Sequence, residues 1–313
     1  MPDRPTGPGS RPRPPRKQPP IPPLSVWPTG QHDHITQLRD AGCVPGTETD
    51  TDQIPPAIAA HAITAYTHPG ELVLDPNCGA GTVLVEALRA DRHALGLTAH
   101  SPWWTLARAN INATKRDGAG RDGSVLEARP RLLATIRAAG LVGRVGLILT
   151  TPRTQPSRHH TAHPDNLNAA FDDLAATVRY CEPLLRAGGR VVVAARPSRQ
   201  PDGSLVDTTT RLIDTALSAG LVPVERCIAL TGALRGDRII ARASLVERRA
   251  AARAGAAGIP IALIAHHEVI VFQHSHDVEL ATADASTPWP TNTSTVTPPT
   301  ANGAEYHCRR PAA

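Results

Sequence analysis

The stretch LVLDPNCGAGTVLVEAL, residues 72–88, decides the fold. It begins with a short apolar run that is typical of a buried strand and ends with apolar residues at helical spacing. The turn between them holds Gly79 and Gly81. Glycine lets the backbone approach a ligand closely, and a helix N-terminus offers free N–H groups to a carboxylate or phosphate. The stretch therefore predicts a strand, a ligand-binding loop and a helix, although a glycine pair alone also occurs in ordinary tight turns.

Short apolar runs and helical patterns alternate on both sides of this unit. Strands are predicted at residues 71–74, 94–97, 123–126, 145–149, 190–195, 222–230 and 269–272. Helices are predicted at residues 54–67, 82–90, 103–114, 132–139, 167–185 and 205–219. Such alternation is typical of an α/β fold with a mostly parallel sheet.

Composition divides the 313 residues into a body and two tails. Residues 1–45 open with Pro/Arg-rich sequence, and residues 279–313 are rich in Thr, Pro and Ala. Both are expected to be disordered because they lack the apolar content of a core, which leaves residues 46–278 as one domain. Most of the net charge of +5 lies in the first tail. That tail either binds DNA or another acidic partner, or is a solvated extension, and the nearly neutral body is a weak footprint for nucleic acid.

Composition also argues against several classes of protein. No apolar run approaches the length of a membrane-spanning helix, and the charged N-terminus does not resemble a secretory signal. The five cysteines are scattered, without a C-x-x-C pair, which argues against a disulfide framework and a zinc site. We expect a cytoplasmic protein with no membrane or metal partner.

Residues 75–82, DPNCGAGT, are similar to a family motif that reads D-P-x-C/A-G-S/A-G-T. Further similarity lies in THPG at 67–70, GLT through LARAN at 96–110, EAR at 127–129 and HEVIVF at 267–272. On these residues the chain resembles the S-adenosylmethionine-dependent DNA methylases of the N-4/N-6 family, and also the tRNA guanine-N2 methylases. The resemblance covers about residues 50–275. It implies a Rossmann-like methyltransferase fold: α/β, with a mostly parallel seven-stranded sheet and a reversed final hairpin strand.

The resemblance implies a site for S-adenosyl-L-methionine around the glycine loop. The residues that correspond to the family's cofactor contacts are Pro55, Asp75, Pro76, Cys78, Gly79, Gly81, Thr82, Thr98 and Glu127. Asp75 would orient the amino acid end of the cofactor, and the loop backbone would cradle it. Glu127 either accepts a hydrogen bond from the adenine amine or is a surface carboxylate. Cys78 either lines the loop or is simply a small apolar residue.

Two positions depart from the family pattern. Thr98 stands where the family has an acid that accepts hydrogen bonds from both ribose hydroxyls, and a neutral acceptor binds them less strongly. The catalytic motif D/N/S-P-P-Y/F/W is replaced by TPRT, so the candidate catalytic residues are Thr151, Pro152 and Arg153. Arg153 is a pure hydrogen-bond donor. Thr154 lacks the ring that would stack on an extruded base, an interaction that contributes about 1–3 kcal/mol.

Aromatic residues and arginines outside these motifs leave alternatives open. The chain has only nine aromatic residues, and Trp103 and Trp104 either border the cofactor adenine or belong to the core. The basic cluster at 158–163 either faces a phosphate or is a solvated loop. Residues 231–260 hold six arginines and either contact nucleic acid or form a solvated amphipathic helix that covers the sheet.

Three functions remain open on the sequence. The first is a methyltransferase acting on an exocyclic amine of DNA or RNA by direct displacement. The second is a catalytically lapsed homologue that binds the cofactor or nucleic acid as a regulator, which the residues at 98, 153 and 154 favour. The third is methylation of a small amine, for which no residue gives positive support.

Overall fold

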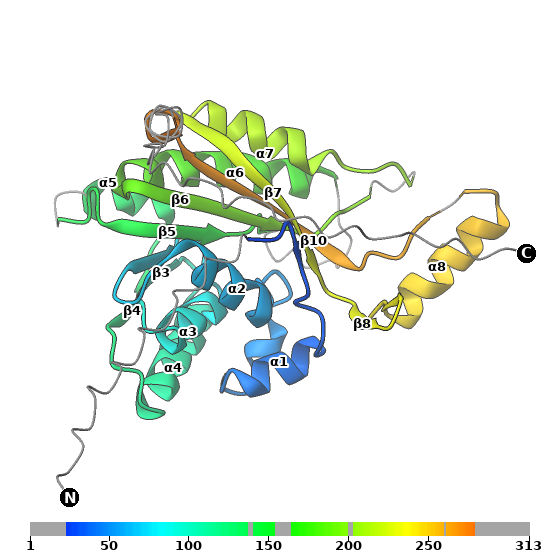
Figure 1. Cartoon of the computed structure of the whole chain (residues 1–313), viewed down its shortest axis with the longest axis horizontal. Coiled ribbons are helices and arrows are strands. Elements are labelled where there is room, and N and C mark those ends of the chain that lie inside the picture. Colours follow the sequence, from blue (N-terminus) through cyan, green and yellow to red (C-terminus); the bar gives the residue numbers. More distant parts are fainter. Residues whose placement is uncertain (1–22, 137–139, 154–163, 200–202, 260, 279–313) are drawn as a thin grey trace, which may run out of the picture.

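The computed structural model of the chain describes residues 23–136, 140–153, 164–199, 203–259 and 261–278. Its centre is an eight-stranded sheet in the order β1-β7-β10-β6-β5-β2-β3-β4, with helices on both faces (Figure 1). The strands are β1 (Val26–Trp27), β2 (Leu72–Asp75), β3 (His93–Thr98), β4 (Gly123–Glu127), β5 (Val145–Thr150), β6 (Leu185–Ala195), β7 (Leu221–Leu230) and β10 (His266–His274). A separate hairpin pairs β8 (Ala233–Arg235) with β9 (Arg238–Ile240).

The sheet is parallel except at β10. This strand runs antiparallel to β6 and to β7, between which it lies, and the remaining neighbours pair in parallel. The Rossmann-like α/β fold with a reversed final strand is therefore confirmed. The sheet has eight strands instead of the predicted seven because β1 adds to the edge of β7.

Two hydrophobic clusters cover the two faces of the sheet. The first packs α2 (Pro56–Tyr66), α3 (Thr82–Arg89) and α4 (Ser101–Arg116) against side chains such as Val73 and Leu147. The second packs α5 (Leu133–Ile136), α6 (Pro164–Cys181) and α7 (Thr208–Leu217) against their sequence neighbours, Leu74 and Ile148. Because successive side chains in a strand point to opposite faces, a sheet covered on both faces needs continuous apolar runs, and all six residues of β5 are buried.

The chain order of the strands positions the ligand loops. β2 lies between β3 and β5 in the sheet. The chain passes from β2 through α3 to β3 and then to β4, and only afterwards returns to β5 on the other side of β2. The connections therefore leave β2 and β5 in opposite directions. In an open α/β sheet, ligands bind outside the carboxyl ends of the strands at such a switch point. The glycine loop follows β2, and Thr151–Arg153 follow β5, so both segments lie at this point.

One predicted helix end is wrong. The helix predicted over 167–185 ends at Cys181, and a single 3₁₀ turn, Glu182–Leu184, leads into β6. Pro183 explains the difference, because proline lacks the N–H that a helix needs and disfavours helical backbone at the residue before it. The predicted strand at 190–195 is accordingly longer and begins at Leu185.

The predicted tail over residues 1–45 is wrong from residue 23 onward. Residues 23–45 contain β1 and α1 (His34–Asp40). The Trp27 side chain is 1% exposed, with its ring centroid 4.4 Å from that of His61. A two-residue strand carries no readable periodicity, so a tryptophan among prolines gave no pattern for the sequence analysis to detect. Residues 1–22 and 279–313, the remainder of the two predicted tails, lie outside the described residues.

No helix among the described residues is long and apolar enough to cross a membrane.

The edge strand makes a testable contribution to stability. Replacing Trp27 with Ala should lower the free energy of unfolding by about 3–5 kcal/mol, because it removes a large buried side chain. Val26→Ala is the matched control on the same strand, since Val26 is 49% exposed and should change stability by less than about 1 kcal/mol. Urea unfolding followed by circular dichroism measures both. Equal effects of the two variants would show that residues 23–45 are not part of the domain.

Candidate functional site at the carboxyl ends of β2 and β5

The glycine loop is a tight turn that ends at the N-terminus of α3. Asp75 closes β2, and one of its carboxylate oxygens accepts a hydrogen bond from the Asn77 N–H (3.1 Å). The Cys78 carbonyl accepts from the Gly81 N–H (2.8 Å). Gly81 is the N-cap of α3 with φ +88°, a conformation that glycine adopts without strain. The N–H groups of Asn77 and Gly81 are therefore bonded within the loop itself.

Burial sets the protonation of Asp75. The carboxyl group is buried, which raises its pKa to about 7, although the Arg153 charge and the Asn77 N–H oppose the shift. Asp75 therefore exchanges a proton near neutral pH, unlike an exposed aspartate.

Residues 44–54, here called the strap, cross the glycine loop. Asn110 of α4, which is fully buried, holds the strap and the loop together. Its amide oxygen accepts from the Val44 N–H (2.7 Å), and its amide nitrogen donates to Thr47 Oγ1 (3.0 Å) and to the Ala80 carbonyl (2.8 Å). At the other end of the strap, Thr82 Oγ1 donates to the Ile54 carbonyl (3.2 Å).

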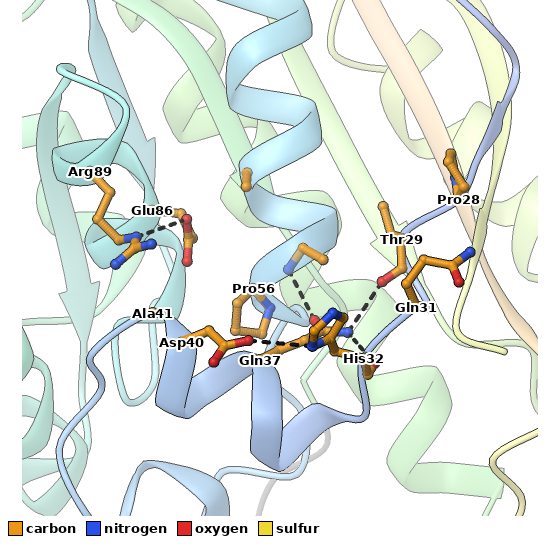
Figure 2. A pocket seen from close by; sticks show the side chains of 12 residues that line it. Pro28, Thr29, Gln31, His32, Gln37, Asp40, Ala41, Pro56, Glu86 and Arg89 are labelled. Carbon is orange, nitrogen blue, oxygen red and sulfur yellow. Dashed lines mark hydrogen bonds and ion pairs between the residues drawn. The ribbon is translucent and has the colours of Figure 1, made fainter. Parts of the chain in front are cut away.

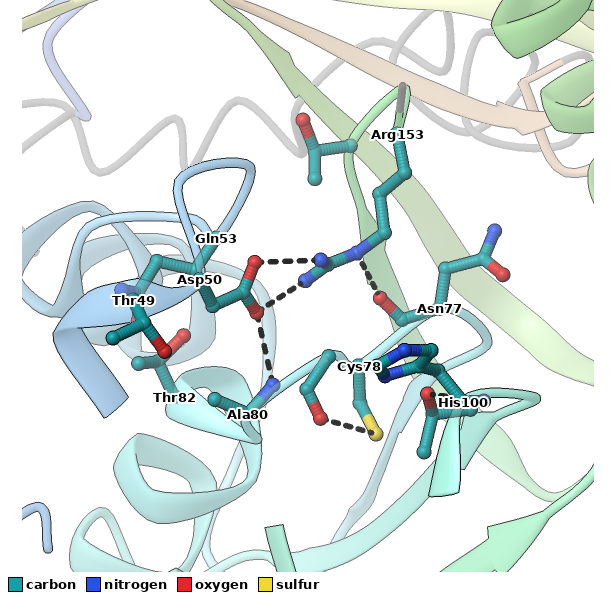
Figure 3. Close-up of polar contacts among 12 residues, drawn as sticks. Thr49, Asp50, Gln53, Asn77, Cys78, Ala80, Thr82, His100 and Arg153 are labelled. Atoms are coloured by element: carbon teal, nitrogen blue, oxygen red, sulfur yellow. Dashed lines mark hydrogen bonds and ion pairs between the residues drawn. The ribbon is translucent and has the colours of Figure 1, made fainter. Parts of the chain in front are cut away.

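The strap inserts the carboxylate of Asp50 into the loop, where it meets Arg153 (Figure 3). The two guanidinium nitrogens Nη1 and Nη2 donate to Asp50 Oδ1 (2.8 Å) and Oδ2 (3.1 Å). Oδ2 also accepts from the Ala80 N–H (2.9 Å), and Arg153 Nε donates to the Asn77 carbonyl (2.5 Å). Asp50 is 2% exposed. Burial opposes the charge of Arg153, but Asp50 outweighs it and raises the pKa of the guanidinium. The pair is thus a bidentate ion pair, which is among the stronger charged contacts in proteins.

Gly79 is required by this pair. A Cβ atom at Gly79 would lie 2.0 Å from Asp50 Oδ2 and 2.3 Å from Arg153 Nη2, and the residue has φ +50°. Only glycine therefore fits beneath the ion pair.

The remaining predicted site residues lie around the same edge. Thr98 is buried at the end of β3 and pairs in register with Glu127 at the exposed end of β4. The Cys78 thiol is buried, and it lies 2.8 Å from where a Cβ would project from Gly96. Pro55 is the N-cap of α2. Pro76 is buried directly after β2.

The candidate catalytic residues separate into two roles. Thr151 Oγ1 and the Pro152 carbonyl lie 3.5 Å apart, at the half-buried end of β5. Arg153 instead turns back onto the glycine loop, 76 residues earlier in the chain. Thr154 and the basic cluster at 158–163 lie outside the described residues. Trp104 packs against the first hydrophobic cluster, and its Nε1 donates to the Val125 carbonyl (3.2 Å).

A polar cluster that the sequence analysis missed lies next to the strap. Gln53 Nε2 is within hydrogen-bond distance of the Thr47 carbonyl (2.9 Å) and of His34 Nε2 (3.1 Å). His34 Nδ1, Gln53 Oε1 and His267 Nδ1 are buried and have no hydrogen-bond partner among the described residues. Burial lowers the pKa of His267 to about 4, so its ring is neutral at physiological pH. His267 and Asn110 belong to motifs that the sequence marks, HEVIVF at 267–272 and LARAN at 106–110, whereas Asp50 and Gln53 carry no signal of their own.

A hollow of about 270 Å³ lies away from the glycine loop, between α1, α2 and α3 (Figure 2). None of the predicted site residues lines it. Its one buried charged group is Glu86, whose Oε2 lies 3.6 Å from Arg89 Nε. Burial raises the pKa of Glu86 to about 7, and the Arg89 charge only partly opposes the shift. No group of three or more potential metal ligands occurs within the described ranges.

The ion pair should show strong energetic coupling. Asp50→Ala and Arg153→Ala should each lower the free energy of unfolding by about 3–5 kcal/mol, because each leaves a buried charge without its partner. The double variant should lose at least about 1 kcal/mol less than the sum of the two single effects. Urea unfolding of the four proteins measures the coupling. Additive losses would mean that the two side chains do not interact in solution.

Glu86 should make stability depend on pH. Its pKa is raised in the folded protein, so the folded state binds the proton more tightly, and the stability that it contributes is lost as pH rises from about 4.5 to about 7. The free energy of unfolding of Glu86→Gln minus that of the natural chain should therefore be larger at pH 8 than at pH 5. The increase should be up to about 3 kcal/mol. Thermal unfolding at the two pH values, with exposed Glu48→Gln as the control, measures the difference. An equal offset of Glu86→Gln at both pH values would contradict the assignment.

The glycine loop lies within a segment that is similar to a known family of proteins. Residues 13–103 match the family model described as DNA methylase. This match begins well ahead of residue 50, where the resemblance was expected to start, and it includes the strap.

Solved structures that are similar to part of this chain include TrmN and two methyltransferases. TrmN from Thermus thermophilus is 18% identical, with a TM-score of 0.46; the alignment covers 76% of this chain and 53% of TrmN. The 1,6-didemethyltoxoflavin-N1-methyltransferase of Burkholderia thailandensis is 15% identical over 77% of this chain and 84% of its own, with a TM-score of 0.41. Magnesium protoporphyrin IX methyltransferase from Synechocystis is 12% identical over 79% of this chain and 89% of its own, with a TM-score of 0.43.

The chain thus spans about half the length of TrmN. Over residues 13–103, from the sequence ahead of β1 to the first turn of α4, it matches the DNA methylase family.

Proposed function

We propose that this protein is an S-adenosylmethionine-dependent methyltransferase that acts on an exocyclic amine of DNA or RNA. The observation that carries the proposal is the glycine loop at the switch point, beside Thr151 and Pro152 and inside the segment that matches the DNA methylase family. The match to the DNA methylase family is in keeping with this class of reaction and leaves the target base open.

The donors and the space around the loop suit the amino acid end of this cofactor. The buried N–H group of Ala80 donates to a carboxylate oxygen of Asp50, and Arg153 adds a guanidinium that can hold a carboxylate with two hydrogen bonds. In the described structure the carboxylate on these donors belongs to Asp50, which stands in for that of a ligand. Because Gly79 has no side chain, the loop backbone lies directly beneath Asp50 and Arg153. Asp75, Thr82 and Thr98 would complete the site.

When bound, S-adenosylmethionine supplies an electrophilic methyl group. The chain's own contribution is to position the target. The Thr151 hydroxyl donates to the Pro152 carbonyl after the end of β5, and each of these oxygens has a further lone pair that can accept. An amine that donates to both would have its own lone pair held in one direction. Holding reacting groups in place in this way is a major source of rate acceleration and needs no covalent intermediate.

Arg153 also affects the charge of the site. A lone guanidinium would repel a cationic ligand, whereas the bidentate contact with Asp50 neutralises it. With Asp50 on these donors, Arg153 therefore adds no net charge to the site.

A catalytically lapsed homologue is the second candidate, and one observation favours it. Arg153 replaces the second proline of the family's catalytic motif, and it is occupied by Asp50 and the Asn77 carbonyl. Such a protein would bind the cofactor and transfer no methyl group.

Calorimetry and a transfer assay separate the two candidates. S-adenosylhomocysteine should bind the natural chain and the Gly120→Ala control, whose added methyl group meets open space. Gly79→Leu should abolish binding, because its side chain would collide with Asp50 and Arg153. Radiolabelled methyl transfer to DNA and to tRNA should then fall at least about tenfold in Thr151→Ala, with cofactor affinity unchanged. Absence of binding at millimolar ligand would overturn the proposal, and binding without transfer would support the lapsed homologue.

A further inference from the structure

Residues 231–259, here called the arm, project from the sheet between β7 and β10 (Figure 1). The arm consists of the β8–β9 hairpin and of α8 (Leu245–Ala256). None of the residues of α8 is buried. A helix that buries no face of its own gains little from tertiary packing, which normally stabilises short helices. This contradicts the expectation of a helix that covers the sheet.

The arm is nevertheless firmly attached. A Cβ on Gly30 would lie 2.4 Å from the Gly232 carbonyl oxygen, so the two backbones are in close contact at the root of the arm. Arg242 donates to the Gly30 and Gln31 carbonyls (3.2 and 2.8 Å). The N-terminus of α8 has a full capping box between Ser244 and Glu247. The arm is therefore a built element, not a loose insertion.

The arm lies at the carboxyl ends of the parallel strands, as the candidate site does. It leaves from the carboxyl end of β7, which is parallel to β6 because both are antiparallel to β10. Arg196, directly after the carboxyl end of β6, pairs with Glu247 of α8. Since β5 and β6 are parallel, Thr151 and Pro152 follow β5 at this edge too.

The surface of the arm is basic and apolar. It holds six arginines and two acidic residues, and Glu247 already has Arg196 as its partner. Arg249 and Arg253, four residues apart on one face of α8, are exposed and make no hydrogen bond or ion pair with any residue that the structure describes. Beside them, Leu245 and Val246 are 71% and 74% exposed.

We propose that the arm binds the phosphate backbone of the nucleic acid that carries the target amine. This inference rests on the proposed function and identifies its partner surface. The planar guanidinium of an exposed arginine can donate two hydrogen bonds to the oxygens of one phosphate, and phosphate contacts position a protein on nucleic acid without reading its sequence. Leu245 and Val246 provide the apolar contact that such surfaces place against sugars and bases.

Fluorescence anisotropy of a labelled duplex DNA and of a labelled tRNA, over a series of salt concentrations, tests the proposal on the full chain. The Arg249→Ala/Arg253→Ala variant should bind at least one of the two at least about tenfold more weakly. Its slope of log affinity against log salt should fall by about 2, close to one unit for each phosphate that no longer has an arginine partner.

Arg116→Ala/Arg179→Ala is the matched control. It removes the same charge from the last turns of α4 and α6, which end at the opposite edge of the sheet, and it should leave affinity within about twofold. Circular dichroism of each variant shows whether the fold is retained.

Three results would overturn the proposal. The first is that the natural chain binds neither nucleic acid. The second is that both double variants weaken binding equally. The third is that the Arg249→Ala/Arg253→Ala variant binds as tightly as the natural chain does. A second copy of the chain is the competing occupant. Sedimentation would reveal it as a dimer that Leu245→Ser/Val246→Ser dissociates while nucleic-acid affinity is unchanged. Calorimetry with S-adenosylhomocysteine keeps the two failures apart, because the cofactor site can bind its ligand whether or not the arm binds phosphate.

Discussion

A half-buried guanidinium needs an anionic partner, and the position of the strap follows from how Arg153 meets that need. Asp50 supplies the carboxylate, and it can do so only because Asn110 and Thr82 hold residues 44–54 across the glycine loop. The same carboxylate satisfies the Ala80 N–H. One ion pair thus joins three segments that are far apart in the sequence: the strap, the loop after β2 and the end of β5. Arg153, which departs from the family pattern, is thus the side chain that links the end of β5 to both the strap and the glycine loop.

The sheet determines which segments can meet in this way. Because β2 and β5 are neighbours whose connections leave in opposite directions, their carboxyl ends open onto shared space. The acceptors Thr151 and Pro152 and the donors of the glycine loop therefore come together without any contribution from a separate domain. The arm adds a surface at this edge while staying outside the hydrophobic clusters.

The sequence predicts the repetitive parts of this structure well. The central strands could be found because they are buried on both faces and so read as apolar runs, as the residues around Val73 and Leu147 do. The glycine loop could be found because its turn needs glycine at Gly81. Trp27 and Asp50 could not, since a two-residue strand has no period and a lone aspartate in a polar stretch resembles any solvated residue. Arg153 could be identified as unusual, but its partner depends on a contact across 103 residues of chain.

The crowding beneath the ion pair limits how this sequence can drift. Any side chain at position 79 would collide with both Asp50 and Arg153, and loss of either charged partner would leave the other buried alone. Substitutions at the three positions are therefore coupled: a tolerated change at one of them requires compensating changes at the others. A lineage that restored the family's second proline at position 153 would at the same step release the strap's aspartate from the loop.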